Sequence, residues 1–144
     1  MANRKVLRII VWLFVIGLIF AFSAIYYVFN MPRRNIAKEN AAFTMTAKQL
    51  ISDFKKDENG ANAKYLDKVI AVSGEIKGIR TLDNHSMVFS LEDAMEGVSC
   101  TIDSADVVRN TSKLSQLKGG ETATFKGRCS GMLMDIQIIN SSPE

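Results

Sequence analysis

The longest pattern in the chain is an uninterrupted apolar run near its N-terminus. Residues 9–29 carry no charged side chain, and about twenty such residues are what an α-helix needs to cross a hydrocarbon core about 30 Å thick. Trp12 lies near one end of the run and Tyr26 and Tyr27 lie near the other, as aromatic side chains do at membrane interfaces. We expect a transmembrane helix over 9–30, after a short basic N-terminus over 1–8.

A cleaved secretory signal is the competing interpretation of this run. Basic residues precede it, and Ala21-Phe22-Ser23 offers the small side chains of a cleavage site. The run continues to Phe29, which is further than the apolar core of a signal extends, and this favours an uncleaved signal anchor. No cysteine follows it to accept a lipid. The Lys and Arg residues on the two flanks are nearly equal in number, so they leave the orientation open.

A helical period begins after a polar tether over 31–45. Thr46 is in place as an N-cap, with Gln49 three residues later as in a capping box. Apolar residues then recur at steps of four, seven and four, which places Leu50, Phe54, Ala61 and Tyr65 on one helical face. Because this phase is kept across Asn59-Gly60, we expect one helix that continues through them with Gly60 facing outward.

From Val69 the period changes to two, which is typical of half-buried strands. Polar turns at 78–86 and around Glu96-Gly97 separate the first three strands, and the last two are expected to meet at a turn that carries Gly127 to Gly131. The residues expected to face inward are, strand by strand, Ile70, Val72, Gly74 and Ile76; Met87, Phe89 and Leu91; Val98, Cys100 and Ile102; Ala123, Phe125, Gly127 and Cys129; Met134, Ile136 and Ile138.

The sequence also predicts which strand residues face outward and what lies between the third and fourth strands. We expect the alternates Val88, Ser90, Ser99 and Thr101 to face outward. Between the third and fourth strands the alternation stops, and Val107, Val108, Leu114 and Leu117 share a short helical face that ends at Lys118-Gly119-Gly120.

Three strands, a short helix and two further strands predict a mainly β fold. This succession is typical of a five-stranded OB-like Greek-key barrel, with the helix between strands three and four. A swapped small barrel without the helix is the alternative. The expected domain spans 46–144, and the barrel in it is preceded by the N-terminal amphipathic helix.

Three segments carry a family resemblance: YLDKVIAVSGEI at 65–76, GVSCTI at 97–102 and FKGRCSGMLMDIQIIN at 125–140. They resemble a bacterial family of small OB-fold envelope proteins called tRNA-anticodon-like, over about Thr46 to Asn140. The resemblance implies an anchor or lipoprotein signal, a helix and then the barrel; the family name reflects a likeness to the tRNA-binding fold. Many members have a further cysteine where this chain has Ile139-Asn140, which leaves Cys100 and Cys129 as the one available pair.

The charge distribution argues against a nucleic-acid partner. The chain has 18 basic and 15 acidic residues, and five of the basic ones flank the apolar run, so that 13 basic residues remain against 15 acidic ones: the five are Arg4, Lys5, Arg8, Arg33 and Arg34. A domain that neutralises phosphates is expected to carry its own basic surplus. An OB domain that stacks bases also shows exposed aromatic residues on strands two and three, where Phe89 is on the inward parity and strand three has none.

The two cysteines both lie on the inward parity of their strands. Two buried thiols and a disulfide both remain open, since a disulfide needs an oxidising compartment and Cα atoms within about 7 Å. Catalysis by Cys129 would need a base, but the one histidine, His85, lies in the polar turn on the other half of the barrel. Two cysteines and one histidine also fall short of the roughly four ligands of zinc. We expect no enzymatic activity, no metal and no cofactor.

The apolar run predicts a single-pass membrane protein, and the resemblance to envelope proteins implies the bacterial inner membrane, with the C-terminal domain in the periplasm. We expect it to bind an envelope protein or a small ligand through loops on a rigid barrel, and we expect nucleic acid to be the less favoured alternative. Met132, Leu133 and Met134 at the last hairpin are expected mainly to pack in the core, with an added apolar contact to the partner as the alternative. The candidate binding residues are Arg80, Asp83, His85, Glu92, Glu96 and Arg128.

Overall fold

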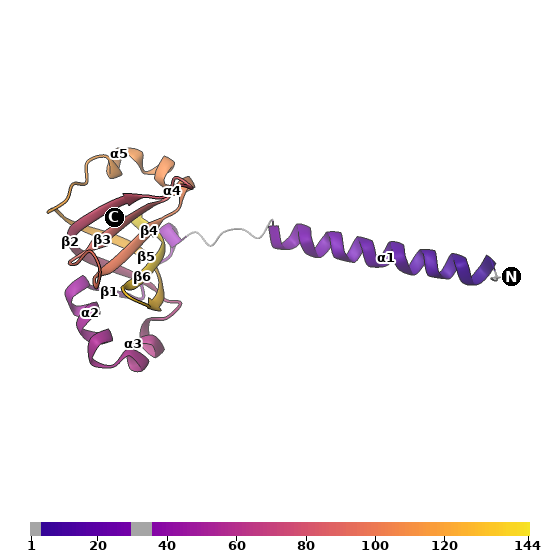
Figure 1. The fold of residues 1–144 in the computed structure, drawn as a ribbon, viewed down its shortest axis with the longest axis horizontal. Coiled ribbons are helices and arrows are strands. Elements are labelled where there is room, and N and C mark those ends of the chain that lie inside the picture. Colours follow the sequence, from indigo (N-terminus) through magenta and orange to yellow (C-terminus); the bar gives the residue numbers. More distant parts are fainter. Residues whose placement is uncertain (1–3, 30–35) are drawn as a thin grey trace. The chain divides into compact units, whose positions relative to one another are not determined.

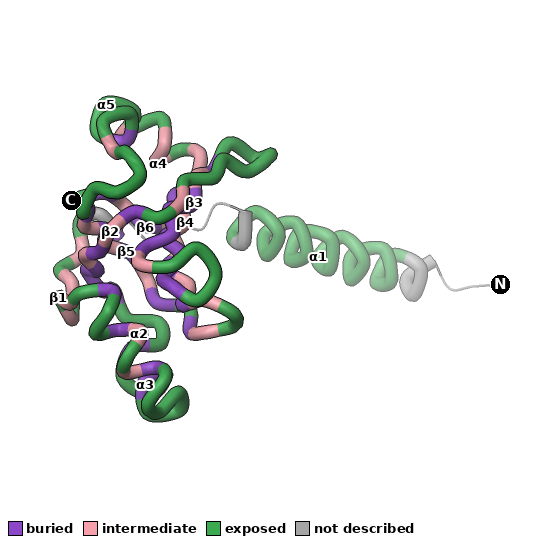
Figure 2. Tube along the Cα trace, turned by 60° about the vertical axis from the view of Figure 1, so that its left-hand side comes forward, coloured by how far each residue is buried: buried purple, intermediate pink, exposed green. Residues whose placement is uncertain are grey.

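The computed structural model describes residues 4–29 and 36–144, which divide into two compact units, Met1–Arg34 and Asn35–Glu144. The first unit is helix α1 (Arg4–Phe29). Its segment Arg8–Tyr27 has a mean hydropathy of 2.6 and is exposed throughout, as Figure 2 shows. The predicted helix is therefore confirmed, and its length and composition fit a membrane anchor and a signal sequence equally. The start of the predicted tether, including Pro32, Arg33 and Arg34, lies outside the described residues.

Five strands of the second unit form a closed barrel. They are β2 (Val69–Thr81), β3 (Met87–Leu91), β4 (Val98–Ile102), β5 (Thr122–Met132) and β6 (Ile136–Pro143). Strand β2 pairs with β3 through its second half and with β5 through its first half, so the order β2-β3-β4-β6-β5 returns to β2. The pairs are antiparallel except β4–β6, which is parallel. This topology confirms the predicted mainly β, OB-like barrel (Figure 1).

The barrel interior is filled mostly by the predicted inward positions. Phe89 and Phe125 are fully buried and stack with ring centroids 4.9 Å apart. Both belong to one apolar core that continues into the helices. Met134 is the exception among the inward set: it is 78 % exposed in the turn before β6, so its predicted core position is wrong.

The predicted outward positions on β3 and β4 are mostly buried, which corrects another expectation. Val88, Ser90 and Ser99 are 7 %, 3 % and 3 % exposed, and Thr101 is intermediate. In the sheet, Ser90 lies between Gly78 of β2 and Ser99 of β4. Period-two alternation marks which face a residue is on, but whether that face is covered depends on the neighbouring strands.

Helices cover both ends of the barrel (Figure 1). One end carries α2 (Ala47–Lys56) and α3 (Glu58–Tyr65), where a single helix was expected. Thr46 caps α2 as predicted, by accepting a hydrogen bond from the Gln49 N–H at 3.2 Å. The chain then breaks at Asp57, whose extended backbone ends α2 and whose side chain accepts from the Gly60 N–H at 3.0 Å. The predicted apolar face is nonetheless buried on both helices.

The other end carries two short helices, α4 (Ser104–Arg109) and α5 (Thr111–Leu114), where the sequence predicted one helical face. Leu114 is buried and Val107 and Leu117 pack against the core. Val108 is 76 % exposed, so its predicted place on this face is wrong.

The segment before α2, predicted as a tether, takes part in the fold. A short 3₁₀ helix, η1 (Ile36–Lys38), buries Ile36 against β5 and β6. Strand β1 (Phe43–Thr46) then pairs in parallel with the first half of β2. The Ala42 N–H also donates to the Val69 carbonyl at 2.7 Å. The sequence missed β1 because a four-residue strand is too short to show a period.

The glycine-rich segment 127–131 lies within β5 rather than in a turn. The register shifts twice along it, between Lys126 and Arg128 and between Cys129 and Met132, so the strand bends there. A Cβ at Gly127 would lie 2.5 Å from Ile138 Cγ2, and Gly131 has φ +94°. The turn itself comes later, before Ile136. The predicted 78–86 turn is likewise shorter, because β2 continues to Thr81.

Candidate binding surface

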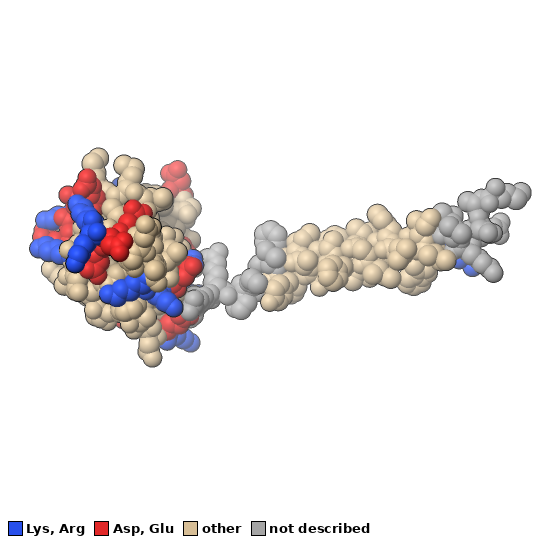
Figure 3. Space-filling view, turned by 90° about the horizontal axis from the view of Figure 1, so that it is seen from below, with Lys and Arg blue, Asp and Glu red and all other residues tan. Residues whose placement is uncertain are grey.

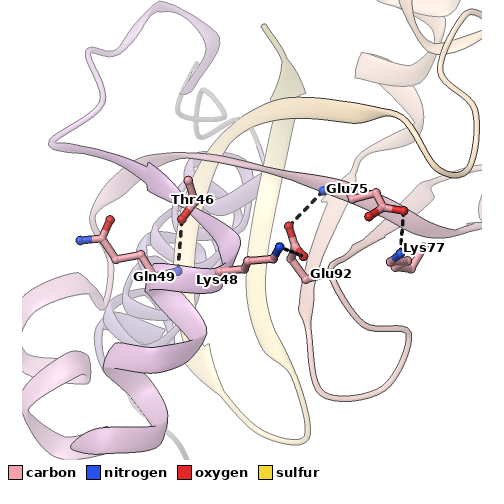
Figure 4. A network of polar contacts seen from close by, with 6 residues as sticks. All are labelled: Thr46, Lys48, Gln49, Glu75, Lys77 and Glu92. Carbon is pink, nitrogen blue, oxygen red and sulfur yellow. Dashed lines mark hydrogen bonds and ion pairs between the residues drawn. The ribbon is translucent and has the colours of Figure 1, made fainter.

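The loop between β3 and β4 is fastened at its start by Glu92 (Figure 4). The Glu92 backbone N–H donates to the Glu75 carbonyl at 2.9 Å, and the Glu92 Oε1 accepts from the Glu75 N–H at 3.3 Å. Its Oε2 lies 3.5 Å from Lys48 Nζ of α2. Glu75 stands between the part of β2 that pairs with β1 and the part that pairs with β3. Glu92 therefore hydrogen-bonds the backbone groups of Glu75, which lie between the β1-paired and the β3-paired parts of β2, and it ties the loop to α2 through Lys48.

The rest of this loop is held by a compact polar turn. Asp93 Oδ1 accepts from the backbone N–H groups of Met95 at 2.7 Å and Glu96 at 3.0 Å. These donors, together with the charge of Lys55, hold the pKa of the Asp93 carboxyl below its usual value. Lys55 Nζ also lies 3.1 Å from Glu96 Oε2. The ordered loop leaves the side chain of Met95 75 % exposed.

The turn between β5 and β6 presents two further apolar side chains. Leu133 is 87 % and Met134 is 78 % exposed. The Leu133 N–H donates to the Asp135 carbonyl at 3.1 Å, and the Asp135 carboxylate accepts short hydrogen bonds from Ser99 and Gln137. The base of the turn is thus fixed to β4 and β6, while its tip is apolar and open to solvent.

The two loops lie side by side at the same end of the barrel. Val98 pairs with Ile136 in the parallel β4–β6 ladder, and the Ile136 N–H donates to the Gly97 carbonyl at 3.0 Å. Neighbouring strands are about 4.8 Å apart. Met95 lies two residues before Gly97 and Met134 lies two residues before Ile136, so the two loops leave adjacent points of the sheet. We call Met95, Leu133 and Met134 the loop-end surface.

This clustering stands out against the rest of the barrel unit. Among the described residues of 36–144, the large apolar side chains that are at least 75 % exposed are Met95, Val108, Leu133 and Met134. Three of the four belong to the loop-end surface. Single exposed apolar residues are ordinary in soluble domains, whereas adjacent ones mark interaction surfaces.

The β3–β4 face, where OB domains stack bases, offers little to a nucleic acid. Phe89 is the one aromatic residue of these two strands, and it is buried in the core. The basic side chains of β5 face carboxylates: Arg128 lies 2.8 Å from Asp67, and Lys126 lies 3.3 Å from Glu144. Figure 3, which views the end that carries α2 and α3, shows basic and acidic side chains interleaved on the barrel unit rather than one basic field.

The structure does not gather the predicted binding residues into one site. Arg80, Asp83 and His85 are exposed around the β2–β3 connection, at the opposite end of β3 from Glu92 and Glu96. Arg128 lies elsewhere, on β5. Glu96 does border the loop-end surface, but the sequence missed Met95 and assigned Leu133 and Met134 mainly to the core. The signal that could have found them is an apolar residue inside a polar turn segment.

A shallow groove of about 270 Å³ lies where α2 meets α3, lined by Asp53, Lys56, Asp57, Gly60, Ala61, Lys64 and Tyr65. Several of its polar groups contact one another. The Tyr65 hydroxyl donates to Asp53 at 2.6 Å, and Lys64 Nζ lies 4.8 Å from the Tyr65 ring centroid. Burial is the main cause that raises the pKa of Tyr65. These contacts join α2 to α3 and leave the groove a structural feature.

The two cysteines are free and buried. Cys100 of β4 and Cys129 of β5 each pair with Ile138 of β6, so one strand lies between them. Two strand spacings are about 9.5 Å, beyond the roughly 7 Å that a disulfide can join. Burial raises the pKa of both thiols. Within the described residues, no three His, Cys, Asp or Glu side chains gather as a metal site would need.

Comparison with known proteins agrees with this architecture. A lipoprotein of Klebsiella pneumoniae, described as a candidate nucleic acid-binding protein, aligns with a TM-score of 0.55 and 21 % identity over 70 % of this chain and 90 % of its own. The Schizosaccharomyces pombe Stn1-Ten1 complex aligns less well, with a TM-score of 0.42 and 13 % identity over 53 % of this chain and 57 % of its own. The first likeness shows the fold alone, and nothing is concluded from the second. A search of curated proteins found no match.

The family comparison covers nearly the whole chain. The tRNA_anti-like family matches residues 1–143, which includes the apolar helix as well as the barrel. This agrees with the OB-like topology and with the segments that carried the resemblance in sequence. The chain is a member of the tRNA_anti-like family.

Proposed function

We propose that this protein is a membrane-anchored, non-enzymatic binding module of the bacterial envelope. Helix α1 holds it in the inner membrane, and the barrel lies in the periplasm, where it binds another protein. The observation that carries the proposal is the loop-end surface: exposed apolar side chains on two loops that leave neighbouring strands and are fixed by hydrogen bonds. Such loops lose little conformational freedom on binding.

A nucleic-acid partner is the rival, because the Klebsiella neighbour is described as a candidate nucleic acid-binding protein. The closed β3–β4 face and the paired basic residues speak against it. Retention of RNA or single-stranded DNA by the full-length protein, falling steeply with salt, would favour the rival instead.

Protease accessibility of a C-terminal tag in spheroplasts tests the arrangement. Digestion with an intact inner membrane is the expected result, and the cleaved product should keep α1 in the membrane fraction. A tag that is cut only after lysis would place the barrel in the cytoplasm and contradict the proposed location. A mature protein that starts after Ser23 would identify α1 as a cleaved signal and contradict the anchor.

A further inference from the structure

We infer that the loop-end surface binds a segment of a partner protein in which apolar side chains are flanked by lysines or arginines. The inference rests on the proposed function, and it specifies the chemistry of the partner. It combines two observations: the exposed apolar cluster of Met95, Leu133 and Met134, and the acidic residues in the same two loops.

The loops that present the apolar side chains carry four carboxylates. These are Glu92, Asp93, Glu96 and Asp135. Lysines of α2 face two of them: Lys48 faces Glu92 and Lys55 faces Glu96. Asp93 accepts from two backbone N–H groups and lies within the field of Lys55, and Asp135 accepts from Ser99 and Gln137. Four carboxylates against two lysines leave a net charge of −2 at these loops. We call the four carboxylates the acidic rim and the three apolar side chains the centre of the loop-end surface.

The negative charge of the rim favours some binding partners of an apolar surface over others. Anionic lipid headgroups and nucleic-acid phosphates carry the same charge sign as the rim and are repelled. A second copy in a two-fold dimer would bring the same acidic loops together. A protein segment with basic residues beside its apolar ones matches both the centre and the rim. Two methionines with flexible, polarisable side chains suit contact with such a segment.

Site-specific photo-crosslinking in the full-length protein, in its own membrane, tests the inference. A photo-crosslinking amino acid is placed at Leu133 in one variant and at Met95 in another. The control carries it at Val108, which is 76 % exposed on α4, at the end of the barrel opposite α2 and α3. We expect Leu133 and Met95 to capture the same peptide, with apolar residues and a net positive charge, and Val108 not to capture it.

Several outcomes would overturn the inference. They are capture of a second copy of this chain, of lipid or of RNA, capture of a peptide without net positive charge, and capture no stronger than at Val108. If Val108 captured a partner and the loops did not, the result would agree with a binding module but contradict the proposed surface. The spheroplast experiment reports on anchoring and location independently of either result.

Charge variants of the rim give a second readout with opposite signs. Glu96→Gln removes an exposed rim charge and should lower capture at Leu133 two- to fivefold. Lys55→Gln removes the lysine that faces Glu96 and should raise capture by a similar factor. Both factors correspond to about 0.5–1 kcal/mol per exposed charge. Both effects should shrink as salt is added. Equal capture by the two variants would contradict an electrostatic role for the rim.

Discussion

Gly127 is the position at which this fold depends most directly on a single missing side chain. An added Cβ would lie 2.5 Å from Ile138 Cγ2, 2.9 Å from Ser141 Cβ and 3.1 Å from the Ile139 carbonyl. Three contacts with the neighbouring strand β6 cannot all relax together, because β6 is itself paired with β4. Glycine at 127 is thus what lets β5 and β6 approach closely where the ladder is bulged.

Gly127→Ala should lower the free energy of unfolding by about 1–3 kcal/mol, as overpacking does in a close-packed interior. The matched control is Gly119→Ala, where the nearest atom to an added Cβ is the Ile76 carbonyl at 4.0 Å; its effect should stay within about 0.5 kcal/mol. Urea denaturation of the full-length protein in detergent measures both. Equal stability of the two variants would contradict the packing that we describe.

The buried thiols predict a loss of stability at alkaline pH. Burial raises the pKa of Cys100 and Cys129 in the folded state, so the unfolded chain releases these protons first. The contribution of the thiols to stability should therefore be constant below their ordinary pKa of about 8.5. It should fall as the pH rises past that value, by up to about 1.4 kcal/mol per pH unit for each thiol that stays protonated. A Cys100→Ala, Cys129→Ala double variant should show a shallower decline, measured by thermal unfolding.

The same thiols also allow a direct test of their covalent state. Since Ile138 lies between them in the sheet, we expect two free thiols after denaturation of the native protein without reductant, even if the barrel lies in the periplasm. Before denaturation neither should react readily with an alkylating reagent, because the thiolate is the reactive form. A protein that yields no free thiol after denaturation would show that the two are bridged.

Among the elements, the α2–α3 pair shows how one local contact decides between two helices and one. The apolar phase of Leu50, Phe54, Ala61 and Tyr65 continues through the break, and all four side chains are buried. Asp57 interrupts the helix by accepting from the Gly60 N–H. Aspartate competes with helical backbone bonds in this way and favours caps.

Asp57→Ala should destabilise the unit by about 1 kcal/mol through loss of this cap. Asp57→Asn is the control, because asparagine caps about as well as aspartate and should keep most of the stability. Hydrogen exchange at the Gly60 amide should quicken in the alanine variant alone. Similar exchange in both variants would show that the Asp57 side chain is not what holds the start of α3.

For the whole molecule, two units with different chemistry share one chain. Residues 9–27 of helix α1 carry no charge and are exposed to their surroundings, whereas the barrel buries most of its apolar residues in one core. The five basic residues beside the apolar run exceed the net charge of +3, so the basic pI of about 8.9 reflects the flanks of that run rather than the barrel. Affinity for a membrane should accordingly reside in the N-terminal unit.

Deletion of residues 1–29 should move the protein from the membrane fraction to the soluble fraction. The full-length protein should remain in the membrane after washing with high salt and carbonate, because an apolar helix is held by the hydrocarbon core rather than by charge. Release by salt alone would indicate electrostatic attachment and contradict an anchor.

The amino-acid sequence was sufficient for the apolar helix, the five barrel strands and nearly all of their inward faces, because periods of 3.6 and 2 record which side of an element is buried. It also indicated the family, through three short segments on four of those strands. It did not indicate β1, the break at Asp57 or the true position of the β5–β6 turn. Strand β1 depends on pairing with a distant strand, and the other two depend on single local hydrogen bonds that leave the apolar period unchanged.

Only the tertiary structure decided which surface is available for binding. Val88, Ser90 and Ser99 are on the outer parity and yet are covered, whereas Met134 is on the inner parity and yet is exposed. The loops that carry Met95 and Met134 are far apart in sequence, and the parallel pairing of β4 with β6 brings their bases together. Exposure and proximity are set by strand order and register, which no local pattern in the sequence contains.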